Sequence, residues 1–136
     1  METEPNNTGT TQKETSVEEP KIGYVNIFVS NFERSLEFYK TALGLEANVS
    51  DESFGYASFQ TRGAAFAFAC TDQTDLVGRH TGIGWVVPDL DQAYQEMLAS
   101  GVEFETPPEK QPWGGYLAIF KDPDDNLFYL DELQDH

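Results

Sequence analysis

Apolar and polar residues alternate in short runs along the chain, and the first run begins at residue 21. In KIGYVNIFVS, Tyr24, Asn26 and Phe28 share one face, and aliphatic residues between them share the other. This period-two pattern predicts a strand. The next run, SNFERSLEFYKTALG, spaces its apolar residues along one face of a helix, with Ser30 or Asn31 as its N-cap. SFGYASFQT and GAAFAFACT then alternate as two further strands.

The second half of the chain repeats this order. A strand is predicted at 83–87, followed by a helix that begins at Asp89 and ends at Gly101, in the run TGIGWVVPDLDQAYQEMLASGVEFE. The strands VEFE, YLAIFKD and NLFYLDE follow. The chain is therefore read as two copies of one β-α-β-β-β unit, about 21–75 and about 79–134. The predicted fold class is α+β, with two βαβββ modules in one domain.

The N-terminal segment differs in composition from the rest of the chain. Residues 1–20 contain one Val and no aromatic residue. Such a segment buries too little apolar surface to offset its ordering entropy. We predict a disordered acidic tail at 1–20 and a single domain at 21–134.

Net charge and cysteine content exclude several classes of partner. The formal charge is −16, from 24 acidic and 8 basic residues, so a phosphate backbone or an anionic membrane would be repelled. The acidity suits a cationic ligand, although solubility is the simpler explanation. The one cysteine, Cys70, excludes an intramolecular disulfide and a multi-cysteine metal site. Without a membrane-length apolar run or a signal peptide, a cytoplasmic protein is expected.

Three stretches of the chain resemble one known family. They are IGYVNIFVSNFERSLEFYKTALGL, VVPDLDQAYQEMLASGV and QPWGGYLAIFKDPDDNLFYLDE. They are similar to the vicinal oxygen chelate superfamily, which includes glyoxalase I, extradiol dioxygenases and the fosfomycin- and bleomycin-resistance proteins. The resemblance implies that the sheets of the two modules form a curved mixed sheet around one cleft. In the bleomycin-resistance branch the modules pair across a two-fold axis, so it also implies a homodimer.

The same resemblance implies where a metal would be held. Family enzymes place His, Gln or Glu on the first and last strands of each module. Those places fall on Tyr24, Gly82, about Ala67 and Tyr129. None of these is a usual ligand for a divalent metal, because Gly and Ala have no donor and a phenol must first lose its proton. We therefore expect no metal or other cofactor, with His80 as the one remaining candidate ligand.

The pleat of the strands assigns residues to the predicted cleft. Phe66 and Phe68 should pack under the helix, which leaves the small residues between them for the cleft. Small residues on the floor and aromatic walls are typical of a small-molecule site. The alternative is close packing of the two modules or of a second chain. The candidate ligand-binding residues are Tyr24, Asn26, Phe28, Ala67, Gly82, Trp113, Tyr116, Tyr129 and Asp131.

Two acidic motifs near the C-terminus are less informative than they look. DPDDN matches the start of a calcium loop, but Leu127 and Leu133 stand where Gly and Glu are required, so a plain turn is predicted. Asp131 and Glu132 are adjacent on a strand and point to opposite faces, so they cannot act as one acid/base pair. The stretch PPEKQPWGGYLAIF is read as a loop that presents Trp113 at the cleft edge, or as a hairpin whose Trp covers the core.

Three hypotheses follow. The first is a non-catalytic protein that binds an aromatic or cationic small molecule in the cleft, without a metal. The second is a metal-dependent lyase or dioxygenase with unusual ligands, such as His80, Tyr129 and Asp131. The third is a dimeric structural or interaction module whose cleft is filled by its own side chains.

Overall fold

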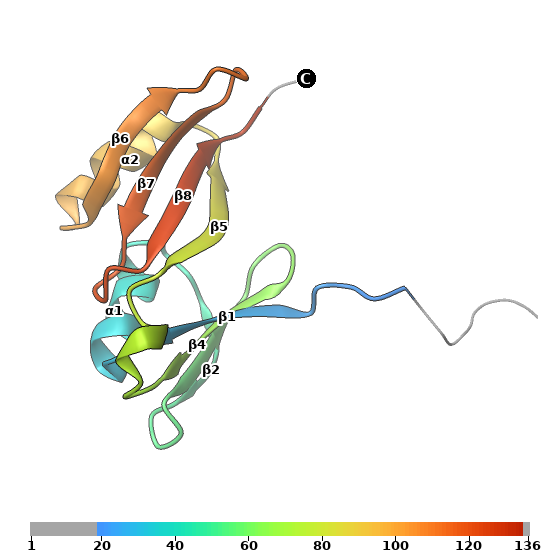
Figure 1. Ribbon diagram of the computed structural model, residues 1–136, viewed down its shortest axis with the longest axis vertical. Coiled ribbons are helices and arrows are strands. Elements are labelled where there is room, and N and C mark those ends of the chain that lie inside the picture. The colour runs from blue at the N-terminus through green and yellow to red at the C-terminus, as the bar shows by residue number, and fades with distance from the viewer. Residues whose placement is uncertain (1–18, 135–136) are drawn as a thin grey trace, which may run out of the picture.

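Two βαβββ modules follow one another in the computed structural model, which describes residues 19–134 (Figure 1). The predicted tail at 1–20 lies almost wholly outside the described residues. The elements are β1 (Tyr24–Val29), α1 (Phe32–Thr41), β2 (Ala47–Asp51), β3 (Tyr56–Phe59), β4 (Ala65–Cys70), the 3₁₀ turn η2 (Thr74–Leu76), β5 (His80–Val87), α2 (Leu90–Ala99), β6 (Glu103–Lys110), β7 (Tyr116–Lys121) and β8 (Leu127–Glu132).

Each module forms its own four-stranded mixed sheet, and the two sheets have the same topology. The strand orders are β1-β4-β3-β2 and β5-β8-β7-β6. The first and last strand of each module pair in parallel, with Asn26 opposite Ala67 in one sheet and Gly84 opposite Tyr129 in the other. The other neighbours are antiparallel. The α+β fold of two βαβββ modules is confirmed.

Each helix begins at a polar cap that the sequence supplies. The Asn31 side chain accepts a hydrogen bond from the backbone N–H of Arg34 at 2.9 Å, and Asp89 accepts one from Gln92 at 3.1 Å. An N-cap of this kind is worth about 1 kcal/mol. Of the two predicted caps for α1, the structure selects Asn31, because Ser30 instead bonds the carboxylate of Asp124.

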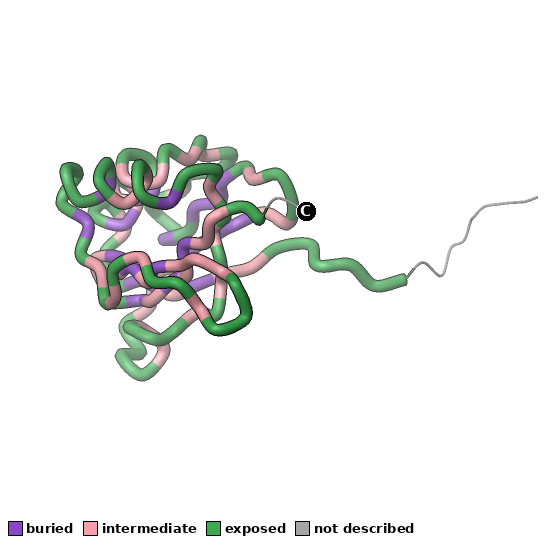
Figure 2. The backbone as a smooth tube through the Cα atoms, turned by 90° about the horizontal axis from the view of Figure 1, so that it is seen from above, coloured by how far each residue is buried: buried purple, intermediate pink, exposed green. Residues whose placement is uncertain are grey.

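The helix-facing sides of both sheets share one aromatic core. The Phe66 ring lies 5.1 Å from Trp85 and 6.0 Å from Phe128, centroid to centroid, so contacts cross from one module to the other. Each fully buried side chain of this size contributes about 1.5–3 kcal/mol. Buried segments lie inside the molecule and the chain before β1 is exposed (Figure 2). The largest fully buried apolar side chains are Tyr39, Phe59, Phe66, Phe68, Phe120, Phe128, Leu90, Leu130 and Val29.

The turn between β7 and β8 also ties the two modules together. Asn126 is 2 % exposed, and its carboxamide nitrogen donates to the carbonyl of Phe28 on β1 at 3.0 Å. Its carboxamide oxygen accepts from the backbone N–H groups of Gly78 and Arg79, at 2.9 and 3.1 Å, just before β5. One side chain therefore joins the first strand of module one, the inter-module connection and the last hairpin of module two.

Asp122 completes this connection at the start of the same turn. Its carboxylate accepts the hydroxyl proton of Tyr39 on α1 at 2.6 Å and the carboxamide proton of Asn126 at 2.9 Å. It also accepts from the backbone N–H groups of Asp124 and Asn126. Asp125 takes a left-handed conformation, with φ 67. The predicted turn is present, and its buried polar groups also join the modules.

Three boundaries differ from those predicted. The strand β2 was not identified because ANVSD offers only two apolar residues, and it lies at a sheet edge. β5 begins at His80, three residues before the predicted strand. β6 continues to Lys110 through Pro107 and Pro108, which were predicted as loop. Proline is tolerated there because β6 is an edge strand with register shifts in its pairing.

Candidate functional site

The face of each sheet that points away from the helices carries most of the predicted site. On β8, Phe128 and Leu130 are buried against the helix side, at 0 and 1 % exposure. Tyr129 and Asp131 alternate with them and remain partly exposed on the opposite face. On β1, Ile27 and Val29 are buried in the same way, so Asn26 and Phe28 take the open face.

A pocket of about 330 Å³ lies where module one meets module two. It brings together three predicted residues, namely Asn26, Phe28 and His80. Arg79 and Thr81 also line it, and neither was predicted from the sequence. We call it the junction pocket; its lining is Val25, Asn26, Ile27, Phe28, Leu76, Arg79, His80, Thr81, Ile83 and Asn126.

His80 connects the junction pocket with the open face of the second sheet. Its ring lies 4.9 Å from the ring of Tyr129, centroid to centroid. Its Nδ1 accepts the backbone N–H of Gly82 at 3.1 Å, so a neutral ring carries its proton on Nε2. The register of β5 against β8 shifts between His80 and Gly84, and Gly82 has φ +73 in this irregular segment.

A second, open hollow of about 500 Å³ lies beside the end of β8. Val86, Trp113 and Asp131 border it, and the Trp113 side chain is 73 % exposed. Trp113 therefore does not cover the core. The Asp131 carboxylate lies over Gly84: a Cβ on that glycine would be 3.0 Å from Oδ2. We call this the β8 hollow; Gly115, Glu132, Leu133 and Gln134 complete its lining.

Burial changes the pKa of the Asp131 carboxyl in the β8 hollow. Partial removal from water raises the pKa of the Asp131 carboxyl above its ordinary value. A cation placed beside it would reverse that effect and hold the carboxylate ionised. Glu132, its neighbour, points the other way and accepts the backbone N–H of Leu90 at 3.1 Å. The two side chains therefore point to opposite faces of β8. Glu132 also lines the hollow, but its carboxylate is held by the N–H of Leu90, so Asp131 is the carboxylate that the hollow offers to a ligand.

Five of the nine predicted ligand-binding residues line neither hollow, and two of these, Gly82 and Tyr129, lie on β5 and β8. Tyr116 lies on the helix side, where its hydroxyl donates to Asp91 of α2 at 2.6 Å, so its predicted place in the cleft is wrong. It shares the face of the buried Ala118 and Phe120. Ala67 is on the open face but is 0 % exposed, so it offers no surface to a ligand. Tyr24 is 68 % exposed and lines neither hollow.

The family's metal places do not fit a metal in this chain. Tyr24, Ala67, Gly82 and Tyr129 supply two phenols and no imidazole or carboxylate. Within residues 19–134 no three His, Cys, Asp or Glu side chains are grouped as a metal site. The expectation of a metal-free protein stays a prediction, and we derive no chemistry through a metal.

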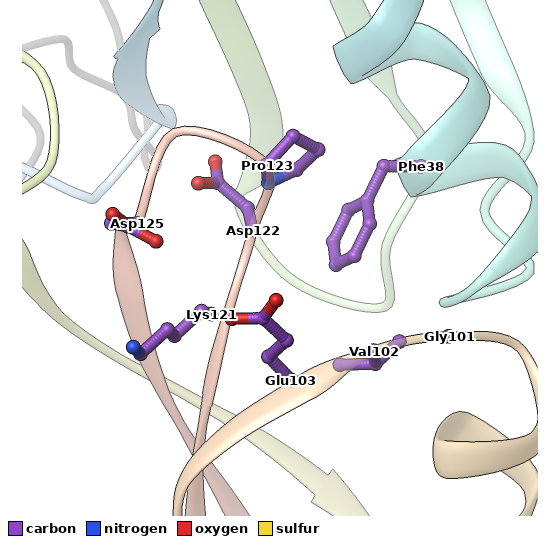
Figure 3. A pocket seen from close by; sticks show the side chains of 8 residues that line it. All are labelled: Phe38, Gly101, Val102, Glu103, Lys121, Asp122, Pro123 and Asp125. Atoms are coloured by element: carbon purple, nitrogen blue, oxygen red, sulfur yellow. The ribbon is translucent and has the colours of Figure 1, made fainter.

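A further hollow of about 230 Å³ lies between α1, the start of β6 and the turn after β7 (Figure 3). Phe38 of α1 and Pro123 flank it, and the carboxylate of Asp122 turns away from Phe38. Asp122 is fully bonded to Tyr39 and Asn126, and Lys121 pairs with Glu105 at 3.6 Å. Two of its four charged side chains, Asp122 and Lys121, are therefore already partnered, which makes it a poorer candidate site than the other two hollows.

The fold of two βαβββ modules defines a class of protein, and comparison with known families agrees. Residues 21–130 match the model of the Glyoxalase/Bleomycin resistance protein/Dioxygenase superfamily. The chain belongs to this superfamily, which confirms the resemblance drawn from its sequence.

The descriptions of the similar proteins compared below name no specific reaction. The chain is 27 % identical, over 81 % of its length and 96 % of the relative's, to the uncharacterized protein YraH of Bacillus subtilis (strain 168). A crystal structure of a superfamily member from Sphaerobacter thermophilus DSM 20745 is 28 % identical with a TM-score of 0.72, covering 85 % of this chain and 98 % of that one. A structure from Nocardioides is 23 % identical with a TM-score of 0.67, covering 88 and 87 %, and supports the fold alone.

The described part of the chain contains no helix that is long and apolar enough to cross a membrane.

Proposed function

We propose that this protein binds a small aromatic cation in the β8 hollow and does so without a bound metal. The observation that carries the proposal is the pairing of a partly buried carboxylate, Asp131, with the exposed indole of Trp113 around one open hollow. A cation gains from a carboxylate and from the face of an aromatic ring at the same time. The net charge of −16 would also attract such a ligand.

The same face offers little for acid/base or nucleophilic catalysis. Asp131 has no second carboxylate beside it, because Glu132 is engaged by the first turn of α2. The thiol of Cys70 lies on the helix-facing side of β4, away from this face, and burial raises its pKa, which favours the less nucleophilic protonated form. These features favour a binding protein over a lyase or dioxygenase.

Calorimetric titration of the full chain with benzyltrimethylammonium tests the proposal. Asp131→Asn and Trp113→Ala should each weaken binding about tenfold, the size expected for losing a partly desolvated charge or ring partner. Asp72→Asn is the matched control, because Asp72 is an exposed acid that lines neither hollow and the change in net charge is the same.

Three results would contradict this proposal. Equal weakening by Asp72→Asn and Asp131→Asn would mean that only overall charge attracts the cation. Stoichiometric binding of nickel, manganese or iron(II) that is lost in His80→Ala would instead favour the metal-dependent alternative. A protein that binds neither cation nor metal would favour an interaction module.

A further inference from the structure

The junction pocket has the opposite charge to the β8 hollow. Among its ten lining residues, all within the described chain, none is Asp or Glu, whereas Arg79 supplies a guanidinium and His80 an imidazole. This is unusual in a chain with 24 acidic and 8 basic residues. A cationic ligand finds no carboxylate here and would meet the charge of Arg79, so this pocket requires a different ligand chemistry from the β8 hollow.

Most N–H donors of the Arg79 guanidinium have no partner among the described residues. Within that part of the chain, its side chain makes one long hydrogen bond, from Nη1 to the carbonyl of Asp75 at 3.5 Å. The ion pairs found within residues 19–134 join Arg34 to Asp124 and Lys121 to Glu105, and neither includes Arg79. A guanidinium carries five N–H donors in a planar fork that matches a carboxylate. Most of that fork is available to a ligand.

Most neighbouring polar groups of the pocket are donors or already engaged. The exception is Asn26, whose carboxamide nitrogen donates to the carbonyl of Ile27 and whose oxygen has no partner among the described residues. His80 uses Nδ1 as an acceptor, so Nε2–H donates in both the neutral and the charged ring. Thr81 donates its hydroxyl to Leu127 and accepts from Ile83. Both ends of the Asn126 carboxamide are bonded within the protein. An acceptor-rich, negatively charged group therefore fits the polar side of this pocket.

The remaining lining of the pocket is apolar, so the part of the ligand that does not contact Arg79 and His80 should also be apolar. Five side chains contribute it, namely Val25, Ile27, Phe28, Leu76 and Ile83. The volume of about 330 Å³ is at the lower end of the range for small-molecule sites. An apolar body carrying one acidic group matches this combination. A multiply charged anion would be repelled more strongly by the rest of this acidic chain.

We propose that the junction pocket binds an organic monocarboxylate, with its carboxylate on Arg79 and His80 and its apolar body against Phe28 and Ile83. This second site goes beyond the proposed cation site and does not depend on it. The two sites differ in charge, in lining and in the residues that test them.

The test is calorimetric titration of the full chain with phenylacetate, with phenylacetamide and inorganic phosphate as separate probes. Phenylacetate should bind, and Arg79→Gln should weaken it at least about tenfold, because charge-assisted bidentate bonds are the strong ones. Arg62→Gln is the matched control: Arg62 is exposed in the β3–β4 connection, and the substitution changes the net charge by the same amount. Thermal unfolding should be the same for both variants.

The outcomes separate this proposal from the cation site. Phenylacetate binding that Arg79→Gln weakens and that Arg62→Gln and Asp131→Asn leave unchanged supports it. The proposal is overturned by no phenylacetate binding at millimolar concentration, or by equal loss in both arginine variants. It is also overturned if phenylacetamide or phosphate binds as well as phenylacetate. None of these results bears on whether benzyltrimethylammonium binds beside Asp131.

Discussion

Tyr39 and Asp122 are joined by a buried hydrogen bond that links α1 of module one to the last turn of module two. Tyr39 is 0 % and Asp122 is 3 % exposed. Burial raises the pKa of the Asp122 carboxyl, while the hydrogen bonds from Tyr39 and Asn126 oppose that rise. Burial, reinforced by the nearby Asp122 charge, also raises the pKa of Tyr39 far above its ordinary value, so the phenol remains a donor.

Because the pKa of Asp122 is raised, its contribution to the free energy of unfolding depends on pH. The folded chain holds this proton more tightly than the unfolded chain does. The contribution is therefore favourable below the ordinary aspartate pKa of about 4, and is lost as the pH rises through the raised value. The hydroxyl of Tyr39 limits that loss because it stabilises the charged carboxylate.

Tyr39→Phe is predicted to lower the free energy of unfolding by about 2 kcal/mol near pH 7, where a buried carboxylate loses one donor. The cost should be smaller near pH 4, where Asp122 is more often protonated in the folded chain. Urea unfolding at the two pH values measures both costs. Tyr56→Phe is the control, since Tyr56 is 36 % exposed and makes no side-chain hydrogen bond within the described residues. A Tyr39→Phe cost independent of pH would contradict this account of Asp122.

At the level of elements, the irregular start of β5 places His80 against Tyr129. Gly82 has φ +73 there, and a Cβ on it would meet nothing within 4 Å. Any cost of adding a side chain would therefore come from the backbone conformation and not from a clash. For an L-residue this left-handed conformation costs about 1–2 kcal/mol.

Gly82→Ala is therefore predicted to lower the free energy of unfolding by about 1 kcal/mol. Gly63→Ala provides a matched comparison, because that glycine also has open space around it but lies outside the left-handed region. It should be neutral or slightly stabilising, by up to about 1 kcal/mol. Urea unfolding of the two variants measures the difference. Equal stability of the two proteins would show that β5 relaxes out of its irregular conformation without cost.

The sequence predicted strands best where one face is buried. The alternation in AFAFAC and LFYLDE correctly placed Phe66, Phe68, Phe128 and Leu130 in the core. It could not reveal β2, whose short polar run is held by pairing with β3. The site was harder to predict than the fold. Arg79 lies outside any periodic pattern, and Tyr116 required knowledge of which face of β7 meets α2.

For the whole molecule, exposed apolar side chains lie on the strands of both modules and in the segments beside them. Val49 and Tyr56 are exposed in the first module, at 48 and 36 %. Val86, Trp113 and Leu133 are exposed in the second, at 59, 73 and 63 %. A second copy that covered these surfaces would bury apolar area that a single chain leaves in water. Together with the implication of the resemblance, this leads us to propose a homodimer in which the second copy borders the β8 hollow, because Val86, Trp113 and Leu133 also line it.

Sedimentation should therefore detect a dimer, and its formation should strengthen with salt, because a charge of −16 on each chain opposes association and salt screens it. Val86→Asp should shift the equilibrium toward monomer by at least about tenfold, since it adds both a desolvation cost and a repulsive charge to the proposed interface. Leu98→Asp is the matched control: Leu98 is 41 % exposed on α2, on the helix side of the sheet, and its substitution adds the same charge. A chain that sediments as a monomer at every salt concentration, or two variants that dissociate equally, would exclude the strand faces as the interface.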